Sequence, residues 1–380
     1  MANLRDYQDW RPSTRQELLL KAALFNGELA FQAWREWRRD YDPARLDYGS
    51  QRLLPLLYRN LKTLGIEDPE LSQFKRAYLD TWAKNKILFS KIAWPLQAFR
   101  EAGIDTLVLK GTSLIVHYYQ DYGVRPMNDF DFLVPTSRAP EAVALLRRLG
   151  WQPQLKHPDR SLEAYLSVNY ALHFSNATGC DIDLHWHVLN ECLGPRSDDN
   201  FWTAAVPIKV GNVESLSLNP SDDLFHICLH GTHWNKMPPI RWVADAMVLL
   251  GSGVQVDWER LFEQASQRAL SLPLAAALGC LVERFDVPVP SGFLDRLKRL
   301  PVSRDERREF HTRMIRPGWS SYIASMWASY PRIFRDTGSQ PGVLGFAKYL
   351  QSFWELDHVW QVPLYAAWRS VKRLFGLPSN

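Results

Sequence analysis

Hydrophobic residues follow helical spacing at both ends of the 380-residue chain and alternate only in a middle stretch. In the first 100 residues, apolar side chains recur at intervals of about three or four positions, which is typical of amphipathic helices. Pro95 predicts a kink or a break, because proline removes a backbone donor, and Gly103 is expected to end the last helix. The predicted helices cover 15–25, 29–39, 51–61 and 69–99.

Shorter apolar runs between residues 104 and 186 predict a mixed region of strands and helices. Two of these runs flank the turn residues Asn-Ala-Thr-Gly, which is typical of a β-hairpin. The predicted elements are strands at 107–110 and 129–134, helices at 112–120 and 138–149, and a hairpin of 170–174 with 181–188.

Beyond Pro220 the spacing is helical again. Ser221 is the expected N-cap of the first helix, with Asp222 and Asp223 in its first turn. Further helices are expected at 239–250, 258–265 and 270–285. We therefore predict an α+β fold in four parts: a helical N-terminal region (1–100), a small mixed-sheet core (101–215), a helical domain that closes a cleft (216–300) and a basic, Trp-rich helical C-terminal region (301–380).

The composition is that of a soluble globular protein, with 46% hydrophobic and 23% charged residues. The net charge of +4 is too small to indicate a nucleic-acid partner by itself. The four cysteines form no Cys-x-x-Cys pair, so neither a zinc site nor a disulfide framework is expected, and a reducing cytoplasm is the natural location. The N-terminus, MANLRDYQDW, lacks an apolar segment, so we expect no signal peptide. Because no apolar run reaches about 18 residues, we expect no transmembrane segment.

The C-terminal region holds 11 Lys or Arg against 6 Asp or Glu, with Trp residues between them. We favour a helical subdomain that packs its Trp side chains inward. Two alternatives stay open: a nucleic-acid surface in which bases stack on the aromatic rings, and peripheral membrane contact through a helix at 360–375. Pro363 weakens the second alternative.

Candidate chemistry begins where a predicted strand ends at Lys110-Gly111 and opens onto a helix. The free N–H groups and positive dipole end of a helix bind anions such as phosphate. The next strand carries Asp129 and Asp131, which share one face because strand side chains alternate. Two acids about 7 Å apart beside a phosphate-binding turn suit Mg²⁺, which prefers carboxylate and phosphate oxygens. A later strand offers Asp181 and Asp183 as a third acid, and spacing alone does not separate the two.

This ordered set resembles the bacterial nucleotidyltransferase family proteins of the DNA-polymerase-β-like superfamily. The resemblance covers roughly residues 100–250 and is carried by four motifs, which read Lys110-Gly111-Thr112-Ser113, Arg125-Pro126, Asp129-Phe130-Asp131 and Ile182-Asp183-Leu184. The chain departs from the superfamily pattern because Thr112-Ser113 follows Gly111 where Gly-Ser is usual. Which of the two hydroxyls faces the phosphates is therefore open.

The resemblance implies that Asp129 and Asp131 bind two Mg²⁺ ions, and that Asp183 completes the shell of one ion and accepts a proton. Apolar flanks, as in the family, favour Asp183 over Asp181. Lys110, Gly111, Thr112, Ser113 and Arg125 are the expected contacts of a nucleoside triphosphate such as ATP.

The implied reaction moves a nucleotidyl group to an acceptor hydroxyl and releases pyrophosphate. The acceptor is open among small molecules, saccharides, peptides and RNA. Phosphoryl or pyrophosphoryl transfer at the same metal site, and a nucleotide- or RNA-binding module without turnover, are the alternatives.

Three histidines, His226, His230 and His233, fall on one face of a predicted helix. Their spacing resembles a metal-ligand set, but no fitting fourth ligand accompanies them, so zinc is not favoured. We expect them instead to line the cleft between the helical and mixed parts, with Arg241 and Asp245 nearby.

Overall fold

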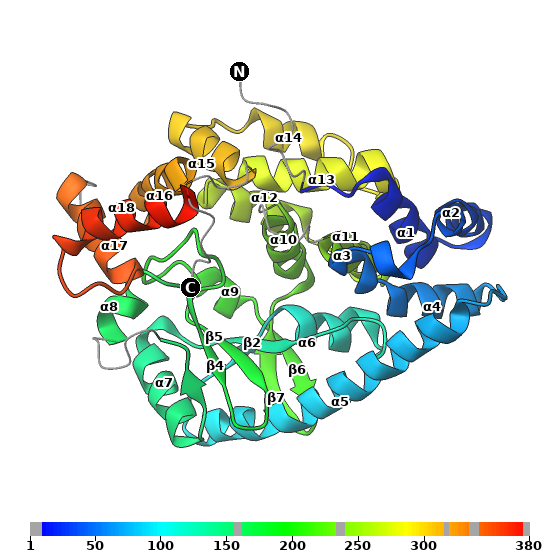
Figure 1. Cartoon of the computed structure of the whole chain (residues 1–380), viewed down its shortest axis with the longest axis horizontal. Helices are drawn as coiled ribbons and strands as arrows, with labels where there is room; N and C mark the ends of the chain where they lie inside the picture. The colour runs from blue at the N-terminus through cyan, green and yellow to red at the C-terminus, as the bar shows by residue number, and fades with distance from the viewer. Residues whose placement is uncertain (1–9, 156–161, 233–239, 315–318, 334–341, 375–380) are drawn as a thin grey trace.

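The computed structural model describes residues 10–155, 162–232, 240–314, 319–333 and 342–374. These residues form helices around one seven-stranded sheet, which confirms the predicted α+β class. The sheet lies low in the view of Figure 1, with a long helical layer above it. None of the helices in these ranges is long and apolar enough to cross a membrane.

The sheet is mixed and runs in the order β3-β4-β5-β2-β1-β7-β6. Its centre pairs β2 with β5 in parallel, so that Asp131 stands opposite Asp183 and Asp129 opposite Asp181. The predicted hairpin is the antiparallel pair β4–β5. The strands are β1 (Leu107–Val108), β2 (Asp129–Leu133), β3 (Gln152–Pro153), β4 (Ala171–Ser175), β5 (Asp181–His185), β6 (Val206–Val210) and β7 (Val213–Ser217).

The N-terminal region is helical, as predicted. The helix expected at 51–61 is divided into α3 and α4, and Pro55 lies in the first turn of α4, where a missing N–H is tolerated. Pro95 lies inside α5 without ending it; its neighbours Leu96 and Phe99 are buried, and this packing offsets the lost hydrogen bond. The helices are α1 (Thr14–Leu24), α2 (Gly27–Arg39), η2 (Pro43–Arg45), α3 (Tyr48–Gln51), α4 (Leu54–Thr63) and α5 (Leu71–Glu101).

The helix that follows β1 begins at Lys110, two residues earlier than predicted, and Lys110 itself has a positive φ of 47°. It continues as a π-helical turn and ends at Gln120, which is left-handed with φ 51°. The helices between the strands are α6 (Lys110–Leu114), η3 (Ile115–Tyr119), η4 (Thr136–Arg138), α7 (Ala139–Arg148), α8 (Leu162–Leu166) and α9 (Asp199–Thr203).

The N-cap of α10 is Asn219, so the prediction of Ser221 is wrong. The Asn219 side chain accepts hydrogen bonds from the backbone N–H groups of Ser221 and Asp222 at 3.0 and 3.1 Å. Pro220 occupies the first helical position, which fixes the start there. The Ser221 hydroxyl accepts instead from the backbone N–H of Asp257 at 2.7 Å.

The remaining helices lie between residues 220 and 374. They are α10 (Pro220–Gly231), α11 (Arg241–Gly251), α12 (Trp258–Gln267), α13 (Ser271–Phe285), α14 (Phe293–Arg299), α15 (Arg304–Met314), α16 (Trp319–Ile333), α17 (Val343–Phe353) and α18 (Gln361–Leu374). Pro363 lies in the first turn of α18 and does not prevent the helix.

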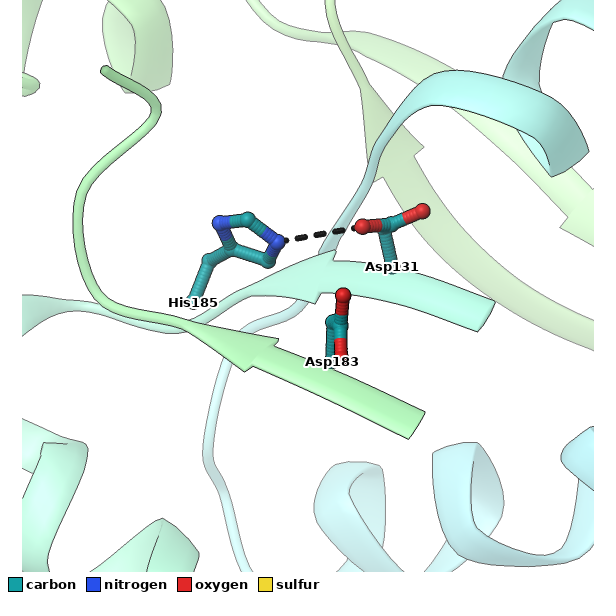
Figure 2. A group of neighbouring side chains, drawn as sticks. All are labelled: Asp131, Asp183 and His185. Carbon is teal, nitrogen blue, oxygen red and sulfur yellow. Dashed lines mark hydrogen bonds and ion pairs between the residues drawn. The ribbon is translucent and has the colours of Figure 1, made fainter. Parts of the chain in front are cut away.

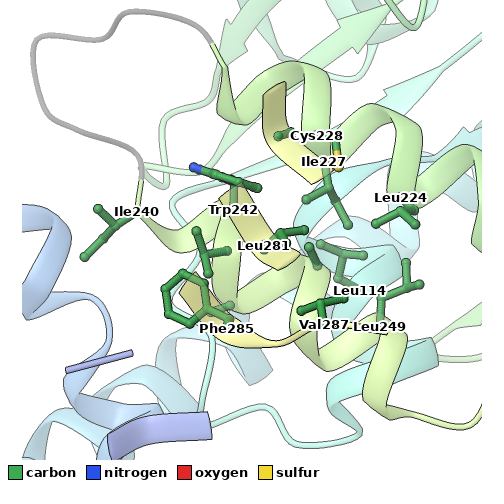
Figure 3. Close-up of a cluster of buried hydrophobic side chains, with 14 of the residues drawn as sticks. Leu114, Leu224, Ile227, Cys228, Ile240, Trp242, Leu249, Leu281, Phe285 and Val287 are labelled. Atoms are coloured by element: carbon green, nitrogen blue, oxygen red, sulfur yellow. The ribbon is translucent and has the colours of Figure 1, made fainter. Parts of the chain in front are cut away.

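Three hydrophobic clusters hold the chain together. The first joins α1–α5 to α10–α14, and Figure 3 shows part of it around Trp242 and Phe285. The second lies between the sheet and the helices α5 and α7, and includes Phe130, Phe132 and Ile182. Because these residues point to that face, the alternating acids of β2 and β5 point to the opposite one.

The third cluster is built by α16–α18 and Val168. Trp354 is buried there, as expected of an inward-packing subdomain. Trp360 and Trp368 are 62% and 46% exposed, so inward packing does not extend to them.

Candidate active site

The two central strands bring Asp131 of β2 together with Asp183 and His185 of β5. One potential ligand atom from each residue lies within 4.8 Å of the other two. Figure 2 shows the three side chains on the same side of the neighbouring strands, with His185 bonded to Asp131. Asp131 and Asp183 were predicted site residues. His185 lies two residues after Asp183 on the same face of β5, and no role was predicted for it.

Asp131 is buried, and its carboxylate contacts one cationic side chain and one imidazole. Its Oδ1 atom forms an ion pair with the Lys110 ammonium and accepts a hydrogen bond from His185 Nε2 at 3.1 Å. Burial alone raises the pKa of Asp131, but Lys110 and then His185 outweigh it and hold the pKa below its ordinary value. Asp131 is therefore a carboxylate with a fixed negative charge.

Asp129 lies two residues earlier on the same face and has a different environment. No hydrogen bond or ion pair reaches its carboxylate within the described ranges. Burial, followed by the negative charges of Asp131 and Asp183, raises its pKa. A partly buried acid beside two others, with no donor of its own, is stabilised by an added cation.

The structure distinguishes Asp183 from Asp181, the two candidates for the third acid. Asp183 Oδ1 pairs with His173 Nδ1 at 2.6 Å, whereas Asp181 lies 3.5 Å from the other ring nitrogen of His173 and is more exposed. Only Asp183 belongs to the group that could hold a metal ion. The donor set of carboxylate oxygens and one imidazole fits a divalent cation, and its acidic part fits Mg²⁺.

A cavity of about 240 Å³ opens beside Asp129 and Asp131. Its walls come from α3, α6, α10 and α11 as well as from β2. Among the described residues, four cationic side chains line it, Arg52, Lys110, Arg125 and Arg241, together with four aspartates, Asp129, Asp131, Asp223 and Asp245. Cationic side chains next to carboxylates are typical of sites that hold phosphate groups with a metal ion.

Arg125, predicted to clamp phosphate oxygens, has two of its three nitrogen atoms engaged in the protein. Its Nε and Nη2 atoms donate to the two oxygens of Asp245 at 2.7 and 2.8 Å. A Cβ atom on Gly111 would lie 2.6 Å from Arg125 Nη1, so the absence of a side chain at Gly111 makes room for the guanidinium. Arg125 therefore ties α11 to the loop before β2 and offers the cavity its third nitrogen.

The two hydroxyls predicted beside the phosphates are both buried, and neither residue lines the cavity. Ser113 Oγ donates to Asp223 at 3.3 Å, and Thr112 Oγ1 has no hydrogen-bond partner within the described residues. The reason is the early start of α6: Thr112 and Ser113 lie inside the helix, and Lys110 and Gly111, its first two residues, line the cavity.

Helix α10 contributes His226 and His230, which line the cavity as expected, with ring centroids 6.4 Å apart. His233 lies outside the described residues. Asp223 also lines the cavity; burial raises its pKa to about 8. Burial, followed by Arg125 and Arg52, lowers the pKa of Arg241 to about 9, so its guanidinium is still charged at neutral pH.

Sequence reasoning missed Arg52 and Tyr48, because the N-terminal helices carry no motif that connects them with the acids. Arg52 Nη2 and Arg241 Nη1 donate to the same carbonyl oxygen, that of Pro126, at 2.9 and 2.8 Å. Pro126 lies just before the acidic strand in the sequence. No local pattern connects Arg52 with Pro126 or with the acids.

A mixed sheet that presents acids to a cation-lined cavity defines a candidate metal-dependent phosphate-transfer site. A family model described as "Uncharacterised nucleotidyltransferase" matches residues 48–286, more than half of the chain. The chain belongs to this family, which makes it a member of a transferase family without an assigned activity. No protein of curated function matches it.

Among solved structures, the chain is similar to an antigenic nucleotidyltransferase-like protein from Paracoccidioides brasiliensis. The identity is 12%, the match covers 57% of this chain and 94% of that chain, and the TM-score is 0.37. A similarity of this size carries no conclusion about the function of the chain.

Proposed function

We propose that the protein is a Mg²⁺-dependent nucleotidyltransferase that moves a nucleotidyl group from a nucleoside triphosphate to an acceptor hydroxyl. The observation that carries the proposal is the meeting of Asp131 and Asp183 on adjacent strands beside the cavity lined by Arg52, Lys110 and Arg241. Acids and cations with these positions match the two needs of the reaction, which are a site for metal and a site for a polyanion.

Asp129, Asp131 and Asp183 would hold the two Mg²⁺ ions of the proposal. Bound Mg²⁺ supplies charge neutralisation of the triphosphate and lowers the pKa of the acceptor hydroxyl. In this proposal Arg52, Arg241 and Lys110 bind the phosphate oxygens and orient the α-phosphorus.

The reaction forms one bond and breaks one. The acceptor oxygen forms a bond with the α-phosphorus, and the bond from that phosphorus to the bridging oxygen breaks, so pyrophosphate leaves with the electron pair. The hydroxyl proton passes to Asp183 and from there to solvent. Little covalent chemistry is required of the protein, because positioning and charge stabilisation supply most of the rate.

The test is incubation of the full chain with Mg²⁺, a cell extract and each α-³²P nucleoside triphosphate, in parallel with γ-labelled ATP. We expect the α label to enter an extract component, and we expect Asp129→Asn and Asp131→Asn to abolish transfer while their circular dichroism spectra match the wild type. Asp181→Asn is the matched control on the same sheet face and is expected to keep activity.

Movement of the γ label alone would replace the proposal with phosphoryl transfer. Nucleotide binding without movement of either label would replace it with a binding module. A cytoplasmic location is part of the proposal; its support is that Cys180, Cys192, Cys228 and Cys280 are all free thiols.

A further inference from the structure

A second cavity, of about 520 Å³, also borders the acidic cluster. Asp183 lines this cavity, whereas Asp129 and Asp131 line the cation-rich one. Since Asp131 and Asp183 are register partners on adjacent strands, the two cavities approach each other at the carboxylates. We call them the Arg52 cavity and the Asp183 cavity. The volume of the latter is typical of small-molecule sites.

The acids around the Asp183 cavity have partners within the protein. Glu191 forms an ion pair with Arg313 at 2.6 Å, and Glu309 forms one with Arg332, also at 2.6 Å. Asp183 is hydrogen-bonded to His173, as described above. Among the described lining residues, three acids accompany one arginine, Arg313, in this cavity, whereas four cations and four aspartates line the Arg52 cavity. The Asp183 cavity therefore has no surplus of cations that would attract a polyanion such as RNA.

Aromatic and amide side chains contribute to the rest of the lining. Tyr165 lies in α8 and Tyr170 directly precedes β4. Tyr349 and Phe353 come from α17, and the centroids of their rings are 5.8 Å apart. Asn169 and Asn190 add amide donors and acceptors. Flat apolar faces combined with a few polar groups suit a ring that has C–H faces and a rim of hydroxyls.

We propose that the Asp183 cavity binds the acceptor and that the acceptor is an uncharged, hydroxyl-rich ring, the chemistry of a sugar residue. The inference rests on the proposed function and deepens it. A hydroxyl of a ring held there lies beside Asp183, the residue that takes the proton, and faces the α-phosphorus held from the Arg52 side. The C-terminal region is then one wall of the acceptor site, through Met326, Tyr349 and Phe353.

The experiment measures sugar and nucleotide binding separately on the full chain with Mg²⁺. Saturation-transfer difference NMR uses an equimolar mixture of the methyl glycosides of glucose, galactose, mannose and N-acetylglucosamine. Fluorescent N-methylanthraniloyl-ATP reports on the Arg52 cavity. The variants are Tyr349→Ala and Asn190→Ala. Trp94→Ala is the matched control, because Trp94 is a 57% exposed aromatic residue of α5 that lines neither cavity.

We expect at least one glycoside to give a signal that falls about fivefold or more in Tyr349→Ala and Asn190→Ala and is unchanged in Trp94→Ala. Nucleotide affinity should change less than about twofold in all three. Asn190 is exposed, so its variant keeps the test valid if Tyr349→Ala unfolds.

Nucleotide binding without any glycoside signal in the wild type would overturn this inference and leave the proposed function standing. Absence of nucleotide binding would overturn the proposed function itself. Glycoside signals that persist in both cavity variants would place the sugar elsewhere. Loss of nucleotide affinity in those variants would assign the Asp183 cavity to the nucleobase instead of the acceptor.

Discussion

Arg52 and Arg241 reach the Arg52 cavity from two helical regions that are far apart in the sequence. Both donate to the carbonyl oxygen of Pro126, and each keeps further N–H groups for a ligand. Because a planar guanidinium can contact two phosphate oxygens at once, these residues are better suited than a lysine to orient a triphosphate.

Replacement of Arg52 with alanine should weaken nucleotide binding. A hydrogen bond to a charged group contributes about 1.5–3 kcal/mol, which corresponds to an increase in Kd of about 10- to 100-fold. Titration with N-methylanthraniloyl-ATP measures it. Arg52→Lys is the control and should recover part of the affinity. Lysine keeps the positive charge but lacks the planar guanidinium that contacts two phosphate oxygens at once. An unchanged Kd in Arg52→Ala would show that the phosphates do not lie at this residue.

Asp223 makes stability depend on pH. Burial raises its pKa to about 8, above the value in an unfolded chain, which is about 3.9. The folded state therefore binds more protons between these values. Its contribution to the free energy of unfolding is complete below the unfolded pKa and is lost as the pH rises through about 8.

We expect the free energy of unfolding of the wild type to fall relative to Asp223→Asn as the pH rises from about 5 to 7.5, by up to about 1.4 kcal/mol per pH unit. The asparagine is neutral at every pH and keeps the shape that accepts from Tyr118 Oη, 3.0 Å away. Urea unfolding at several pH values measures both proteins. If the free energies of unfolding of the two proteins change in parallel with pH, the prediction is wrong.

At the scale of elements, the wall of the Arg52 cavity depends on the close packing of α10 against α11. A Cβ atom added to Gly231, the last residue of α10, would lie 2.2 Å from the ring of Trp242. Trp242 is buried in the cluster of Figure 3, together with Ile227 and Leu281. The ring and its closely packed neighbours would have to shift to accept the added atom.

Gly231→Ala should therefore destabilise the protein by about 1–3 kcal/mol, the usual effect of overpacking. It should also weaken nucleotide binding, since His226 and Asp245 of the same two helices line the cavity. Chemical denaturation and nucleotide titration measure the two effects. Gly279→Ala is the matched control: Gly279 lies inside α13 with nothing within 4 Å of an added Cβ, so alanine should stabilise by about 0.5–1 kcal/mol. Equal effects at the two glycines would refute the packing argument.

At the scale of the whole molecule, the N-terminal helices and the helices after the sheet share one hydrophobic cluster. The ring centroids of Trp10, which precedes α1, and Trp242 of α11 are 5.8 Å apart. The two groups of helices are therefore expected to open together, although the mixed region separates them in the chain.

Leu57→Ala in α4 should reveal this coupling, because it removes a fully buried side chain and costs about 2–5 kcal/mol. Amide hydrogen exchange should accelerate in α10–α13 as well as in α1–α4. Leu79→Ala, at a half-exposed position of α5, should leave the exchange rates of both groups of helices unchanged. Faster exchange confined to α1–α4 would show that the two groups unfold independently.

The sequence by itself determined the features that depend on near neighbours. Alternation placed Asp129 and Asp131 on one face of a strand and Phe130 and Phe132 on the other, and the structure has both sets so placed. Apolar spacing predicted most helices within a few residues. The prediction of Ser221 as N-cap failed, because Pro220 begins the helix one residue earlier and leaves Asn219 as the cap.

Only the tertiary structure decided which residues meet. The parallel pairing of β2 with β5 sets Asp183 rather than Asp181 beside Asp131, and it brings in His185. Folding of α3 and α11 onto the loop at Pro126 brings Arg52 to the acids, and the early start of α6 withdraws Thr112 and Ser113 from the cavity. Periodicity reports the burial of one face of an element, whereas contacts between distant elements depend on how those faces pack, and no local pattern contains that information.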